Sequence, residues 1–118
     1  MTIKGQFRIP IYRADVYVIV TDQLMRVINY RLKEIGEDPL EIEPGAFFIR
    51  KDQSSDYYLY FTFEMLTLPI INHEKSHLID YILKDCGMKK DDEGRAYLDQ
   101  FITEKLQKFF KIKGLKVK

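Results

Sequence analysis

Residues 57–63, Tyr57-Tyr58-Leu59-Tyr60-Phe61-Thr62-Phe63, decide the fold class of this chain. From Leu59 onward every second residue of the run is apolar, so one face of a strand built from it is fully apolar. Such a face has to be buried against another element. We interpret it as core and not as a platform for stacking bases, because no basic residues are interleaved with the aromatic ones.

Three further segments complete the predicted sheet and its connections. Ala46 to Arg50 is a second aromatic and β-branched run, and the polar residues 51–56 separate it from the first, which predicts a hairpin. Arg13 to Val20, rich in valine, isoleucine and tyrosine, predicts another strand. Glu37 to Gly45 contains two prolines and predicts a connecting loop.

Three helices are predicted around these strands. The first covers 23–36, after an N-cap at Thr21-Asp22 and up to a terminating glycine. The second covers 69–86, with a proline in its first turn and a glycine after its last. The third begins at Asp91-Asp92 and carries an apolar stripe of Leu98, Phe101, Ile102, Leu106, Phe109 and Phe110. This order of elements predicts an α+β fold, with helices packed on a small, mostly antiparallel sheet.

The composition is that of one ordinary soluble domain. The chain has 118 residues, 46% of them hydrophobic and 31% charged, which suffices for a core and predicts a single domain. No apolar run approaches the roughly 20 residues of a membrane span, and the first residues lack the features of a signal peptide. The single cysteine, Cys86, excludes an internal disulfide and fits a reducing compartment. We therefore expect a cytoplasmic protein without a membrane partner.

The net charge of +1 argues against a nucleic-acid partner attracted by the whole molecule. The charge is uneven, however, because no acid follows Glu104 and the chain ends in a basic tail at about 111–118. The lysines after Glu104 are Lys105, Lys108, Lys111, Lys113, Lys116 and Lys118. Such a tail can contact phosphate or anionic lipid. We favour the alternative of a solvated helix face with a frayed end.

The segment His73-Glu74-Lys75-Ser76-His77 is an H-E-x-x-H motif inside the second predicted helix. Residues four apart lie on one helix face about one turn apart, so both imidazoles can reach one metal ion. Glu74 projects beside them, where it can act on a water molecule without binding the metal. The motif holds the only two histidines of the chain, which favours a zinc site over a chance pair of surface histidines.

A third ligand is expected from an acid on the following helix. Glu93 lies at the start of that helix, and antiparallel packing at about 8 to 10 Å brings its carboxylate toward the histidines. Asp91 and Asp92 are competing choices, but Glu93 reaches further and the aspartates fit helix capping. Catalytic zinc sites combine three protein ligands with an open position for water.

Two other residues are candidates for supporting roles. Asp80, three residues after His77, can orient a ligating histidine, and a solvated helix acid is the equal alternative. Tyr97, four residues after Glu93, can polarise a substrate carbonyl or belong to the core.

The motif and its surroundings resemble a group of small phage and prophage proteins regarded as zinc metallopeptidases of the gluzincin type. The resemblance rests on Asn72 to Ile82, on Gly87, and on Asp92-Glu93-Gly94-Arg95-Ala96-Tyr97-Leu98, with a weaker likeness at 16–22. Those proteins share H-E-x-x-H-x-x-D-Y-I, a short turn with glycine, and an acid followed by a small residue and A-Y-L. The resemblance implies zinc on His73, His77 and Glu93, with Glu74 as catalytic base, in the cytoplasm of a bacterial host.

Two positions depart from the pattern of that group. Lys75 is charged where zinc peptidases generally have an uncharged residue, and Gly94 replaces an expected alanine. A lysine at this place can extend to solvent. The departures therefore concern catalysis more than metal binding.

Three functions are compatible with these features. We favour a zinc-dependent peptidase or related hydrolase, with a peptide or protein substrate aligned along an edge strand and Glu74 as general base. The second is a metal-stabilised phage interaction protein without catalysis. The third, least favoured, is a nucleic-acid or membrane-surface protein that acts through the lysine tail. The oligomeric state is left open.

Overall fold

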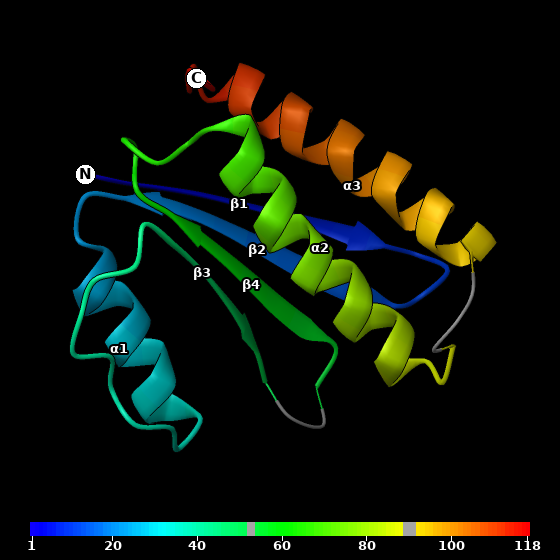
Figure 1. Cartoon of the computed structure of the whole chain (residues 1–118), viewed down its shortest axis with the longest axis horizontal. Helices are drawn as coiled ribbons and strands as arrows, with labels where there is room; N and C mark the ends of the chain where they lie inside the picture. Colours follow the sequence, from blue (N-terminus) through cyan, green and yellow to red (C-terminus); the bar gives the residue numbers. More distant parts are fainter. Residues whose placement is uncertain (52–53, 89–91) are drawn as a thin grey trace.

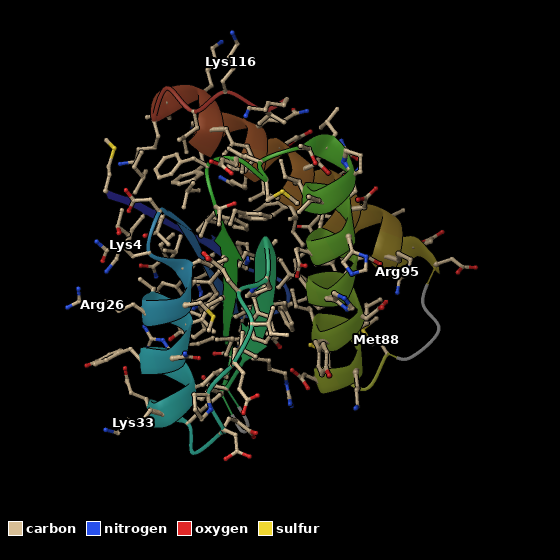
Figure 2. The ribbon with its side chains drawn as sticks, turned by 60° about the vertical axis from the view of Figure 1, so that its left-hand side comes forward. Lys4, Arg26, Lys33, Met88, Arg95 and Lys116 are labelled. Atoms are coloured by element: carbon tan, nitrogen blue, oxygen red, sulfur yellow. The ribbon has the colours of Figure 1, made fainter. Side chains whose placement is uncertain are left out.

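Four strands and three helices make up the part of the chain that the computed structural model describes, residues 1–51, 54–88 and 92–118. The elements are β1 (Thr2–Ile9), β2 (Ala14–Thr21), α1 (Leu24–Glu34), β3 (Ala46–Arg50), β4 (Asp56–Phe61), α2 (Leu68–Asp85) and α3 (Asp92–Ile112). The sheet has the order β1-β2-β4-β3, so β1 and β3 are its edges. Helices α2 and α3 cover one face and α1 covers part of the other (Figures 1 and 2).

The predicted α+β fold with a small, mostly antiparallel sheet is confirmed. Strand β1 pairs antiparallel with β2, and β3 pairs antiparallel with β4. Strands β2 and β4 are parallel, because α1 and the loop after it return to the end of the sheet where β2 finishes, and β3 then runs back, so that β4 starts at the same end as β2 (Figure 1). This crossover joins two hairpins into one mixed sheet.

Strand β1 is the element that the sequence interpretation missed. Its even-numbered residues are exposed and polar, and the odd-numbered ones are partly or fully buried. This alternation is visible in the sequence, but Gly5 takes the place of one apolar residue on the inward face. The glycine is required because a Cβ atom there would lie 2.3 Å from the Phe109 ring of α3.

Alternation along the central strands builds two cores. In β4, Leu59 and Phe61 are fully buried under α2 and α3, as the apolar face of residues 57–63 predicted. Tyr58 and Tyr60, on the opposite face, are also buried, against α1. Both faces of β4 are therefore covered, which suits a strand with a neighbour on each side.

The first two helices begin and end within a few residues of the predicted positions. The predicted N-cap at Thr21-Asp22 is wrong, because the N-cap of α1 is Gln23, which makes no side-chain capping hydrogen bond. The Thr21 hydroxyl accepts a hydrogen bond from the Gln23 N–H before the helix begins. Gly36 adopts a φ of 78° after the helix, a conformation that favours glycine. Helix α2 has Thr67 as N-cap, which accepts from the Ile70 N–H, and a proline in its first turn. Residues 52–53 of the predicted polar turn lie outside the described residues.

The end of the chain is ordered, so the expected frayed tail is wrong. Leu115 and Val117 pack against the main core. The Lys118 N–H donates to the Leu66 carbonyl at 2.9 Å, and the Leu68 N–H donates to the Lys118 carbonyl. The lysine side chains of 111–118 are nevertheless exposed, as expected for a solvated face.

Candidate metal centre

The two histidines of the motif converge on the exposed side of α2. The Nε2 atoms of His73 and His77 lie 3.1 Å apart, and the ring planes are nearly perpendicular. Both residues are exposed to solvent. The convergence arises within one helix, since residues four apart share a face.

The spacing of these nitrogens fits two positions of a zinc site. Two nitrogens at about 2.0–2.1 Å from a tetrahedral ion lie about 3.3 Å apart. The 3.1 Å between His73 Nε2 and His77 Nε2 is a hydrogen-bond distance, and it is also close to that separation. The donor set is imidazole nitrogen, which zinc readily accepts.

Glu74 lies beside the pair but points inward. It is 7% exposed and is one of the few buried polar residues in the described part of the chain. Burial raises the pKa of its carboxyl group, and the charges of His77 and His73 oppose that rise. Within the described residues the Glu74 side chain makes no hydrogen bond. A largely buried carboxyl group next to two imidazoles is typical of a functional site.

Edge strand β3 runs along the same side of α2. The Phe48 ring of β3 stacks on the ring of His77, with 6.4 Å between the ring centroids, and also on Tyr81. At the far end of the helix, Arg50 binds both carboxylate oxygens of Asp85 at 2.7 Å. These contacts hold the histidine-bearing helix against an edge of the sheet.

The acid expected as third ligand is not brought to the histidines. Asp80 of α2 forms an ion pair with Arg95 of α3. Glu93 precedes Arg95 on the antiparallel helix, so it lies toward the C-terminal end of α2, away from the two histidines. Across residues 1–51, 54–88 and 92–118, no group of three or more histidine, cysteine or acidic residues is arranged to hold a metal ion.

The competing acids give the same result. Asp92 is exposed in the first turn of α3, where a negative charge is favourable beside the helix N-terminus. Asp91 lies outside the described residues. The third position of the site is therefore not filled by a described side chain as it stands.

The two supporting candidates have other contacts. Asp80 is exposed and paired with Arg95, so it does not orient a histidine in this arrangement. Tyr97 lies against the rings of Tyr12 and Phe101, with 36% of its surface exposed. These contacts place Tyr97 over the side of α3 that faces the β1–β2 hairpin.

Lys75 has a structural role that the sequence did not reveal. Its Nζ atom lies 2.8 Å from an Asp99 oxygen and donates to the Thr103 hydroxyl at 2.9 Å. The side chain therefore joins α2 to α3 and does not extend to solvent. Its helical position on the α3 side of the motif, opposite the histidines, was the available signal.

A comparison of the chain with protein-family models, with curated proteins and with solved structures found no match. The family resemblance drawn from the motif thus stays a prediction. Among the described helices none combines the length and the apolar character that a membrane span requires.

Proposed function

We propose that this protein is a zinc-dependent hydrolase of peptide bonds, with His73 and His77 as metal ligands and Glu74 as general base. The observation that carries the proposal is the 3.1 Å approach of the two Nε2 atoms beside a buried carboxyl group. The third ligand is left open, and the two histidines converge without it.

Zinc in such a site lowers the pKa of water to about 7 and polarises a carbonyl group. The two imidazoles would hold the ion at the solvent-exposed side of α2. Glu74, whose pKa burial raises, is suited to accept a proton from the attacking water and to donate it to the leaving amine.

Substrate alignment is assigned to the edge strand β3. An edge strand has unpaired backbone groups on its outer side, and an extended peptide can add to them as a further strand. Because Phe48 of this strand contacts His77, a peptide paired with β3 would pass the histidines. The architecture thus favours an extended peptide over a compact substrate.

The decisive test compares Glu74→Gln with wild type. The variant should bind one zinc ion per chain, because the ligands are unchanged, and should lose at least about 100-fold in peptide hydrolysis, which is the usual contribution of a general base. Glu41→Gln, an exposed change of equal charge, is the control and should keep full activity. Equal hydrolysis by Glu74→Gln and wild type would exclude the mechanism.

One observation favours a second candidate, a metal-stabilised interaction protein. The described residues offer two converging imidazoles and no third ligand in place. Binding of zinc by wild type, with a rise in thermal stability and no hydrolysis of any peptide tested, would select this candidate.

A further inference from the structure

The face of the sheet on the α1 side is incompletely covered. The apolar cluster beneath α1 draws its buried residues from β2, β3, β4 and the helix, and none from β1. The side chains of β1 on this face, Thr2, Lys4, Gln6 and Arg8, are all exposed. A hollow of about 450 Å³ lies at the margin between α1 and this open strand.

Aromatic side chains form the floor of this hollow. Tyr17 of β2 stacks on Tyr58 of β4, with 4.9 Å between ring centroids and 16° between ring planes. Tyr17 is only partly buried, whereas Tyr58 and Tyr60 are buried beneath it. Tyr30 of α1, 68% exposed, stands at the rim. Flat rings at the surface of a sheet are what unpaired bases stack on.

Basic side chains surround these rings. The hollow is lined by Lys4 of β1 and by Arg26 and Arg31 of α1, and no acid is among its described lining residues. Lys4 and Arg26 extend on the same side of the molecule (Figure 2) and form no ion pair within the described residues. The Arg31 guanidinium lies 4.3 Å from the Tyr58 ring centroid, and its Nε atom is buried without a hydrogen-bond partner there.

The nearest described acids form an ion pair with only one of the three cations of the hollow, Arg31. Burial raises the pKa of the Tyr17 hydroxyl, and the charges of Asp56 and Asp15 add to that rise, yet neither acid lines the hollow. Asp15 is paired with Arg8 at 2.9 Å, and Glu34 lies 3.6 Å from Arg31 at the other end of the site.

The basic surface continues over the edge of the sheet. Lys4 also lines a second hollow, of about 380 Å³, on the α3 side of β1. That hollow contains Lys105, Lys108 and Lys113 beside the Phe109 ring, again with no acid among its described lining residues. Two acid-free hollows that share Lys4 therefore form one path around β1.

We propose that this path, from the Tyr17 hollow across β1 to the Phe109 hollow, binds single-stranded nucleic acid. A base would stack against the Tyr17 side of the first hollow, and successive phosphates would contact Arg26, Lys4 and the lysines of α3. Duplex bases are already stacked and paired, so the rings of the hollow select a single strand. The path lies apart from the histidines, and the proposal is independent of metal binding.

The test is fluorescence anisotropy of a short labelled oligothymidylate, titrated with the full chain at several salt concentrations. Lys4→Gln and Arg26→Gln should each reduce the slope of log affinity against log salt by about 0.7, the value for one phosphate contact on a single strand. Tyr17→Leu should weaken binding about tenfold, and Tyr17→Phe, which keeps the ring, should bind like wild type. Lys33→Gln, an exposed change on the same helix outside both hollows, is the matched control.

Three results would overturn the proposal. The first is an equal decrease of the salt slope, that of log affinity against log salt, in Lys33→Gln and Lys4→Gln, which would indicate only a diffuse electrostatic attraction. The second is unchanged affinity in folded Tyr17→Leu. The third is equally tight binding of a duplex of the same length. Because Lys4 and Arg26 are exposed, their variants should keep the fold. They therefore still test the proposal if Tyr17→Leu is unstable.

Discussion

Zinc should stabilise the wild-type protein through His73 and His77, and replacing His77 by alanine should abolish the effect. The 3.1 Å between the two Nε2 atoms corresponds to an angle of about 98° at an ion bound at about 2.05 Å, near the tetrahedral value. Free zinc at 100 times the dissociation constant adds about 2.7 kcal/mol to the free energy of unfolding. Unfolding of 118 residues carries an entropy of roughly 250 cal/mol/K, so the melting temperature should rise by about 11 °C.

The assay is thermal unfolding followed by circular dichroism across a zinc titration. Since His77 also stacks on Phe48, its replacement lowers the stability of the metal-free protein, and the zinc-induced shift is the quantity to compare. His73→Ala should lose the shift equally, and Ser76→Ala, an exposed change on the same helix, should keep it. Glu93→Gln tests the third ligand, because a smaller shift is expected only if that carboxylate binds the ion. A shift of equal size in wild type and both histidine variants would refute the convergent site.

Three further predictions concern stability. Burial raises the pKa of Glu74 in the folded state, so the metal-free wild-type protein loses stability as the pH rises through that pKa. In urea unfolding, the free energy of unfolding of Glu74→Gln relative to wild type should therefore be higher at pH 7 than at about pH 3.5. An equal difference at both pH values would contradict this. Asp85→Asn should lower the free energy of unfolding in urea by about 1–3 kcal/mol, because Asp85 accepts two hydrogen bonds from Arg50 and one from Tyr57. A decrease below about 0.5 kcal/mol would show that these hydrogen bonds are dispensable. Leu98→Ala should cost about 2–5 kcal/mol by chemical unfolding, since Leu98 is fully buried in α3, and a neutral result would argue against the packing of that helix.

Local features of the molecule followed from the sequence because their causes are local. The alternation in residues 57–63 is a property of one strand, and its apolar face is buried as expected. Gly36 and Gly87 end their helices because each adopts a positive φ, which other residues rarely do. The approach of His73 to His77 depends only on the pitch of one helix, so the motif alone predicted it.

Tertiary structure decided every feature that joins separate segments. The register of α3 on α2 depends on which side chains meet, and the Lys75–Asp99 and Asp80–Arg95 pairs place Glu93 away from the histidines. No periodicity within α3 encodes that offset. The burial of Glu74 likewise depends on the packing of α2 against the sheet.

The surface around β1 shows the same division most clearly. Residues 57–63 lack interleaved basic residues, so their pattern does not predict a basic aromatic surface. In the folded chain Lys4, Arg26 and Arg31 line the same hollow as Tyr17, although they come from one strand and one helix that are separate in sequence. Sequence patterns report the faces of single elements, whereas the assembly of side chains from several elements is fixed only when strand order and helix packing bring them together.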